Sequence, residues 1–137
     1  MLTNTTITIF NQFPDRKQNK MIFVPHVIPE VWFHKDQKSS VKGNGLESAD
    51  EYKIRIPFSL CSEWVPEHEF NSLEESGNKW TVQNGDLFIV GEWRGGNITR
   101  IKDIKKEFSG EIGQVLSHSE NFFGSSKHIR IGGGGSV

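Results

Sequence analysis

The stretch YKIRIPF at residues 52–58 is the clearest indication of the fold, because its apolar and polar side chains alternate strictly. A period of two places the apolar side chains on one face, which is typical of a half-buried β-strand. Similar but shorter segments rich in β-branched and aromatic residues lie on both sides of it. Their ranges are 5–11, 21–24, 31–34, 80–82, 87–90, 111–118 and 128–131. Pro25 and Pro29 interrupt the chain, so 26–28 is predicted to be an edge strand or a bend.

Turn and helix signals separate these segments. Asn84-Gly85 lies between two apolar segments, and this pair predicts a hairpin because both residues tolerate positive φ. Pro66 suits the first position of a short helix that ends near Leu73. A second helix is predicted from Arg100 to Phe108 with Thr99 as its cap, and its apolar positions fall on one face.

Two segments are predicted to lack regular structure. Residues 36–50 are polar and contain glycine, which indicates a long exposed loop. The glycine-rich end, 132–137, is predicted to be a flexible tail that resembles a linker. We therefore expect a single domain over 1–131 followed by this tail. The fold class is mainly β: a small barrel or sandwich of about seven short strands, with two short helices and long loops.

Composition narrows the classes of function. The 137 residues fit one domain, and the net charge of −1 argues against a protein whose main task is to grip nucleic acid. Cys61 is the only cysteine, so no internal disulfide can form and a reducing compartment is expected. The first residues do not read as a signal peptide, and no stretch is apolar enough to span a membrane. We expect synthesis in the cytoplasm and no contact with a membrane.

The residue types needed for catalysis do not form a coherent set. The five histidines lack the spacing of a zinc site; His34 and Asp36 could share a metal along a strand, but so could many surface pairs. Cys61 follows a strand and precedes Trp64, which favours a buried thiol over a nucleophile. We expect no enzymatic activity, no metal and no cofactor.

Two features indicate binding instead. Phe122-Phe123 lies in a loop and is either an interface or a plug that covers the end of the barrel. The second helix carries several cations, which form either a solvated face or a weak lining that faces DNA. These cations are Arg100, Lys102, Lys105 and Lys106.

Four stretches carry a resemblance to a known family: LTNTTITIFN at 2–11, GLESADEYKIRIP at 45–57, WTVQNGD at 80–86 and FGSSKHIRI at 123–131. In their order and spacing they resemble small proteins encoded by siphophages and prophages of Gram-positive bacteria. These are known as minor capsid or head–tail connector proteins. The resemblance runs from residue 2 to residue 131 and contains no catalytic motif.

The resemblance implies a structural role in the neck of a tailed virion, after synthesis in the bacterial cytoplasm. The closest such role is the head-closure, or stopper, ring, a small β-barrel that retains packaged double-stranded DNA and offers a docking surface to the tail. Implied partners are the portal and adaptor proteins, a tail-completion or tail-terminator protein, and copies of itself in a dodecameric ring. We expect a monomer in isolation. Alternatives are a capsid-decorating or other minor capsid protein, or a small phage hydrolase.

A ring needs two distinct contact surfaces on each subunit. The loop at 36–50, with Lys42 and Asn44, is the expected reaching segment. Candidates for the two surfaces are Phe122-Phe123 and the edge near Pro25 and Pro29. The cations of the second helix are the candidates for facing the DNA channel.

Overall fold

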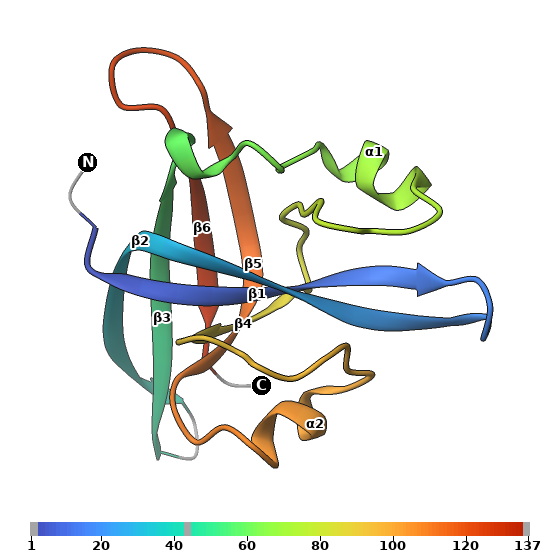
Figure 1. Cartoon of the computed structure of the whole chain (residues 1–137). Coiled ribbons are helices and arrows are strands. Elements are labelled where there is room, and N and C mark those ends of the chain that lie inside the picture. The colour runs from blue at the N-terminus through green and yellow to red at the C-terminus, as the bar shows by residue number, and fades with distance from the viewer. Residues whose placement is uncertain (1–2, 43–44, 136–137) are drawn as a thin grey trace.

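The computed structural model describes residues 3–42 and 45–135, with the side chains of 37–50 left out (Figure 1). Six antiparallel strands close into a barrel in the order β1-β2-β3-β6-β5-β4. The fold class is therefore confirmed as mainly β, and the barrel holds rather than the sandwich. The strands are β1 (Thr5–Asp15), β2 (Lys20–Lys42), β3 (Gly45–Pro57), β4 (Leu87–Val90), β5 (Ile112–Asn121) and β6 (His128–Gly134). The helices are η1 (Phe58–Leu60), α1 (Glu67–Ser72) and α2 (Ile101–Lys105).

The interior of the barrel is filled by side chains at alternate strand positions, as the alternation at 52–58 predicts. Tyr52, Ile54 and Ile56 of β3 are all at most 1% exposed. The Tyr52 ring meets the Phe88 ring of β4 edge-on, with the centroids 5.5 Å apart. A second cluster, built around Phe10 and Ile104, lies between the barrel wall and α2. Each such buried side chain contributes about 1.5–3 kcal/mol relative to exposure.

β2 is one strand of 23 residues, where three separate segments were predicted. Its first half pairs with β1, including Pro25 opposite Phe10, and its second half pairs with β3 from Trp32 onward. The first half therefore has only one strand beside it apart from a single bridge between Phe23 and Ile98. An edge strand accommodates proline, which has no N–H to donate. The predicted interruption of the strand at Pro25 and Pro29 is therefore wrong, but the predicted edge position of 26–28 is correct.

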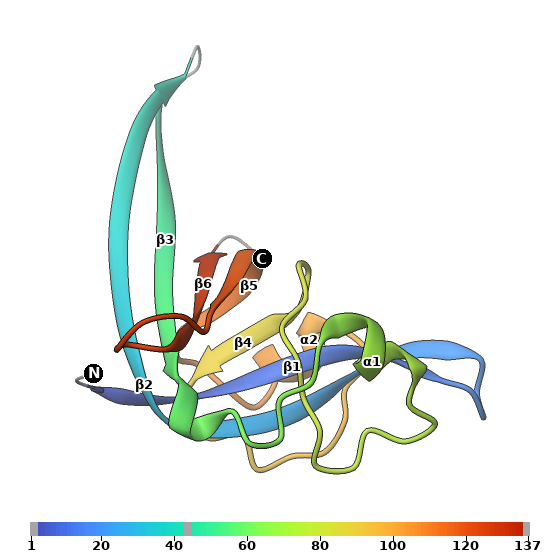
Figure 2. The ribbon, with the colours of Figure 1, turned by 90° about the horizontal axis from the view of Figure 1, so that it is seen from above.

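The predicted loop at 36–50 is also wrong, because its backbone forms a hairpin. β2 continues to Lys42, β3 begins at Gly45, and the register runs from Asp36 opposite Glu51 to Lys42 opposite Gly45. In the described chain, residues 37–42 and 45–50 pair only with each other. This part of the hairpin therefore projects from the barrel (Figure 2). The sequence of this segment has no alternation of apolar and polar residues, which is why it resembles a loop.

The glycine-rich end is part of the barrel. β6 continues through Gly134, with Gly133 paired to Tyr52 on one side and Val115 on the other. A Cβ atom at Gly133 would lie 2.8 Å from the Phe88 ring. The expected domain end at 131 and flexible tail from 132 are therefore wrong up to Gly134: glycine is present because a ring lies against the backbone. Residues 136–137 lie outside the described part.

The segment before β4 forms a turn without the predicted hairpin. Gly85 has φ +95°, as expected, but 80–82 makes only an isolated bridge between Trp80 and Trp64. β4 pairs with β1 and β5 instead. The carboxylate of Asp86 accepts the Gln83 N–H at 3.0 Å, so a side chain takes the place of a strand partner.

Both helices form, and α2 is shorter than predicted. Its N-cap is Arg100, so the prediction of Thr99 as the cap is wrong. Thr99 is a donor instead: its N–H and its hydroxyl each donate to Asp103 Oδ2 at 3.1 Å. Asp103 therefore closes the first turn, and Ile104 faces inward and is fully buried.

Candidate interaction surfaces

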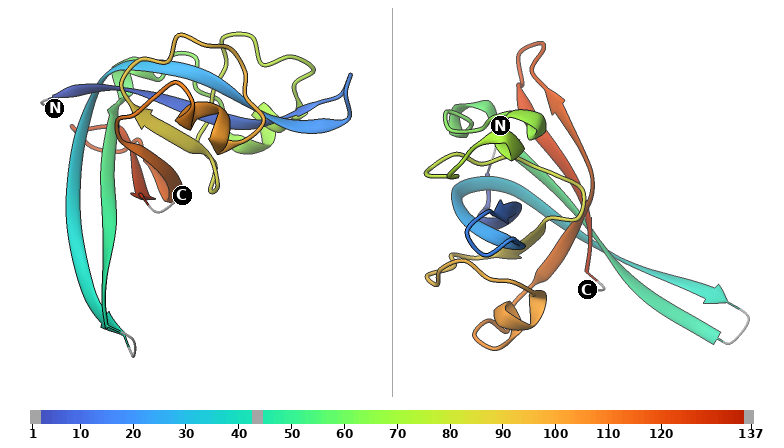
Figure 3. Two further views of the ribbon diagram at one scale, coloured as in Figure 1. Left: turned by 90° about the horizontal axis from the view of Figure 1, so that it is seen from below. Right: turned by 90° about the vertical axis from the view of Figure 1, so that its right-hand side faces the viewer.

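The hairpin formed by residues 37–42 of β2 and 45–50 of β3, called here the arm, projects from the barrel (Figures 2 and 3). Each of its strands has six residues beyond the barrel, which at about 3.3 Å per residue gives a reach of about 20 Å. Within the described backbone its two outer edges are unpaired. Such edges are templates for a further strand. Lys42 ends β2 at the far end of the arm, and Asn44 lies outside the described residues.

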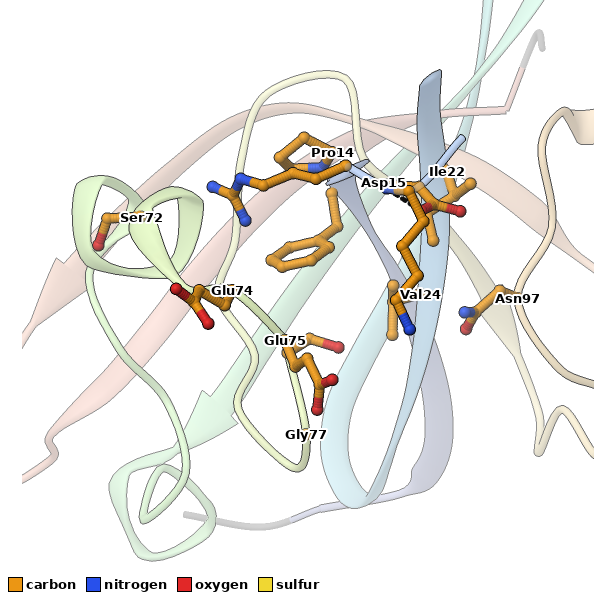
Figure 4. Close-up of a pocket in the computed structure, with 13 residues that line it drawn as sticks. Pro14, Asp15, Ile22, Val24, Ser72, Glu74, Glu75, Gly77 and Asn97 are labelled. Carbon is orange, nitrogen blue, oxygen red and sulfur yellow. Dashed lines mark hydrogen bonds between the residues drawn. The ribbon is translucent and has the colours of Figure 1, made fainter. Parts of the chain in front are cut away.

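A second hairpin, formed by Asn11–Asp15 and Lys20–Val24, extends from the other side of the barrel. A groove of about 690 Å³ separates its tip from the loop that follows α1. Figure 4 shows Ile22 and Val24 on the hairpin side, with Glu74 and Glu75 on the loop opposite. The hairpin side thus combines apolar side chains with the charged turn at 15–17, and the loop opposite is acidic.

Arg16 holds the two walls of this groove together. Its guanidinium donates to the carbonyl oxygens of Leu73 and Asn71, the latter at 3.3 Å. Below it the Phe13 ring meets the Phe70 ring of α1 edge-on, with centroids 5.3 Å apart. The sequence alone did not identify this groove. The available signal was the charged turn between two apolar segments, where Asn19 takes a positive φ of 53°.

The structure separates the two phenylalanines of the β5–β6 loop. Phe122 packs edge-on against Phe58 and Trp64, each with a centroid distance of 5.4 Å. Phe123 points outward and is 91% exposed. Of the two interpretations left open, the covering role applies to Phe122, and Phe123 is the residue available for a partner.

We expect the two positions to differ in their effect on stability. Phe122→Ala should lower the free energy of unfolding by about 2 kcal/mol, because it removes a partly buried ring from an aromatic cluster. Phe123→Ala should change it by less than about 0.5 kcal/mol, as is usual for exposed sites. Urea denaturation followed by tryptophan fluorescence measures both. Equal destabilisation by the two variants would contradict the assignment.

The remaining predicted interface residues lie on the barrel wall. Pro29 is exposed, and its carbonyl accepts the Thr6 hydroxyl at 2.7 Å, while Pro25 is half-buried opposite Phe10. They are far along β2 from the arm, so the structure does not join them to Lys42 in one surface.

The cations of α2 are all exposed. Arg100 lies 3.9 Å from Asp103 Oδ1, so its charge is partly offset. Hydrogen bonds, first that from the Thr99 N–H, lower the pKa of Asp103, which keeps it ionised at neutral pH. Lys102, Lys105 and Lys106 add positive charge around the same short helix.

The structure shows the surroundings of the residues that were considered for catalysis or metal binding. Burial raises the pKa of Cys61 to about 11, so at neutral pH it is a thiol, which lies 3.5 Å from the Pro57 carbonyl. His34 Nε2 and Asp36 Oδ1 are 2.9 Å apart. Among the side chains that the structure describes, those of 3–36 and 51–135, no cluster of three or more His, Cys, Asp or Glu could hold a metal ion. In the same ranges no helix has the length and apolar character needed to cross a membrane.

The one fully buried carboxylate, among the described residues, is Asp86. It accepts hydrogen bonds from Asn11 Nδ2 at 2.7 Å, the Gln12 N–H at 2.9 Å and the Gln83 N–H at 3.0 Å. Gln12 Nε2 is a fourth donor at 3.2 Å. Burial raises the pKa of Asp86 to about 6, and the hydrogen bonds oppose that rise without cancelling it. Its partners tie β1 to the turn before β4, which is a structural role.

These features define a closed six-stranded antiparallel β-barrel protein with two projecting hairpins. The chain belongs to a family of unknown function (DUF6751), whose model matches residues 2–134. That range includes the glycines of β6. No curated protein and no solved structure matches the chain.

Proposed function

We propose that this protein is a structural component of the neck of a tailed phage, where it forms the head-closure ring. In this role it sits between the portal–adaptor complex and the tail, retains packaged DNA and offers a docking surface to the tail-terminator or tail-completion protein. The resemblance of residues 2–131 to head–tail connector proteins supports this assignment. So does a rigid barrel with projecting hairpins and no recognised catalytic set among its described residues.

The observation that carries the proposal is the arm with its two open edges. A strand edge recognises another chain by main-chain hydrogen bonds, and this mode of association requires no catalytic chemistry. If the arm of one subunit pairs with a strand of the next, the contact joins two different patches. Contacts of that kind generate rings when the rotation between subunits closes.

The arm also explains why an isolated subunit is expected to be monomeric. A two-stranded hairpin is marginally stable alone, and three or more strands are needed for independent stability. The portal–adaptor complex would place neighbouring arms together so that each completes the other's sheet. The exposed Phe123 offers a further contact on a different face of the barrel.

The test is an arm deletion. Asp36 and Glu51 are direct partners in the register, so residues 37–50 can be replaced by the two-residue turn Asn-Gly without disturbing the five remaining β2–β3 pairs, Trp32–Asp36 with Glu51–Arg55. We expect this variant to keep the circular dichroism spectrum and thermal melting of the intact barrel. It should fail to form rings on purified portal–adaptor complexes, as seen by electron microscopy and gel filtration.

Glu107→Gln is the control, because it changes an exposed residue outside both the arm and the β5–β6 loop and should form rings as the wild type does. Full ring formation by the arm deletion would overturn the role given to the arm. Binding of the wild-type protein to capsids that lack a portal would overturn the neck assignment in favour of a capsid-decorating protein.

A further inference from the structure

Two arginines face each other on the outer wall of the barrel. Arg55 of β3 and Arg130 of β6 are direct partners in the register, and both are exposed. Like charges placed directly opposite each other destabilise a sheet. In the described part of the chain no carboxylate forms an ion pair with either guanidinium. No carboxylate of the described barrel therefore offsets the repulsion between the two guanidinium groups.

The surroundings of the pair form a small built recess. A hollow of about 170 Å³ is lined by Arg55, Arg130, Lys53 and the backbone side of Ile54. The Arg55 guanidinium lies over the Trp32 ring of β2, 4.9 Å from its centroid. This stacking restricts Arg55 before any ligand arrives, which lowers the entropy lost on binding.

Charge on this wall is distributed unevenly. Toward the arm, Asp36 lies 3.6 Å from Lys53 Nζ and also contacts His34, so that end is largely neutralised. At the other end Arg130 is flanked on β5 by Ser119, its direct partner. The positive charge that remains is thus concentrated at the two guanidinium groups.

We propose that the Arg55–Arg130 pair binds phosphate groups of a nucleic-acid backbone. Guanidinium groups present forked donors that match phosphate oxygens in pairs, and two of them on adjacent strands are suited to a phosphodiester chain. Ser119 adds a hydroxyl of the kind that contacts DNA phosphates without reading sequence. A bound phosphate also relieves the repulsion between the two arginines.

The choice of double-stranded DNA as the nucleic acid rests on the proposed function. The site differs from the one expected from sequence, since it lies on the wall formed by β2, β3, β6 and β5 and not on α2. Its residues belong neither to the arm nor to the β5–β6 loop, so binding of DNA and assembly of the ring can be tested separately.

The experiment compares two charge-matched double variants of the isolated protein. Fluorescence anisotropy with a labelled 20-base-pair duplex at low salt measures affinity, and its salt dependence reports how many phosphates the protein neutralises. R55Q/R130Q should weaken binding about tenfold or more. It should also reduce the slope of log K against log salt by about 2, because each guanidinium neutralises one phosphate. K102Q/K105Q removes the same charge from α2 and should bind as the wild type does.

A second measurement gives an independent readout. R130Q should melt at or above the temperature of the wild type, because the like-charge pair is removed. Absence of duplex binding by the wild type, or loss of binding only in the α2 variant, would overturn the proposal. Equal affinity for a polyglutamate of matched charge would overturn the choice of phosphate. If R55Q/R130Q forms rings on portal–adaptor complexes, the neck assignment stands even where the phosphate site is overturned. If the wild type also forms no rings, the neck assignment fails as well.

Discussion

Gly113→Ala is expected to destabilise the barrel by about 3 kcal/mol, as measured by urea denaturation, since overpacking a close-packed core costs about 1–3 kcal/mol and sometimes more. A Cβ atom at Gly113 would lie 2.4 Å from the Phe88 ring, a distance that real Cβ atoms do not reach. Phe88 is itself 1% exposed and held by Tyr52 and Gly133, so its ring has no room to move away.

The control for this prediction is Gly96→Ala. A Cβ atom at Gly96 would have no neighbour within 4 Å, and Gly96 is not among the positive-φ glycines, so the change should be nearly neutral. Combining Gly113→Ala with Phe88→Leu should cost less than the sum of the two single changes, because the smaller side chain makes room for the methyl group. A neutral Gly113→Ala variant would show that the ring does not lie against this backbone.

Asp86→Ala is expected to cost at least 3 kcal/mol in the free energy of unfolding at neutral pH. The change removes the acceptor of the backbone N–H groups of Gln12 and Gln83 and of one hydrogen bond from each of the Asn11 and Gln12 side-chain amides. Each buried unsatisfied group costs about 1–3 kcal/mol. Asp86→Asn, which keeps one of the two oxygens, should fall between the wild type and Asp86→Ala. Glu107→Gln removes an exposed charge and is the neutral control.

The same carboxylate predicts a pH dependence. Because the pKa of Asp86 is raised to about 6, the folded protein binds this proton more tightly than the unfolded chain does. The proton-linked part of its stabilisation, up to about 3 kcal/mol, is therefore fully present below about pH 4 and is lost as the pH rises through about 6, while the hydrogen bonds to the ionised carboxylate remain. Burial lowers the pKa of His26, which acts in the opposite direction but equally in wild type and variant.

The difference in stability between the wild type and Asp86→Ala isolates the Asp86 contribution, and it should narrow between pH 4 and pH 7. The carboxyl ¹³C resonance of Asp86 should titrate with a midpoint near 6. A midpoint below 4, with a stability difference that does not vary with pH, would mean that the four hydrogen bonds outweigh burial.

In the proposed role, different surfaces of the barrel would bind different partners. The arm and Phe123 would contact neighbouring proteins, while the Arg55–Arg130 wall would contact phosphate. Both surfaces have features that carry a cost in the isolated subunit: open strand edges, an exposed aromatic ring and facing like charges. Such features persist when a partner compensates for them, so each marks a surface at which to test binding.

Local patterns predicted the elements that have one buried and one exposed face. The alternation at 52–58 placed Tyr52, Ile54 and Ile56 inside correctly, and the helix and turn signals located α1, α2 and the bend at Gly85, although the predicted cap of α2 was wrong. For the surfaces, the sequence singled out Phe122-Phe123 but could not say which ring is covered. Packing against Phe58 and Trp64 decided that, and the groove at Arg16 had no recognised signal.

Local sequence patterns were sufficient to predict a β-structure with two short helices, because burial of one face imposes a period of two on the residues of a strand. That 37–42 and 45–50 pair as an arm, and that the glycines at 132–134 complete the barrel, became visible only in the folded chain. The polar sequence of the arm shows no such period, and a strand of glycines has no side chains to show one. Arg55 and Arg130 face each other because of the register between β3 and β6. These two residues are over 70 positions apart in the sequence, so no local pattern predicts that they meet.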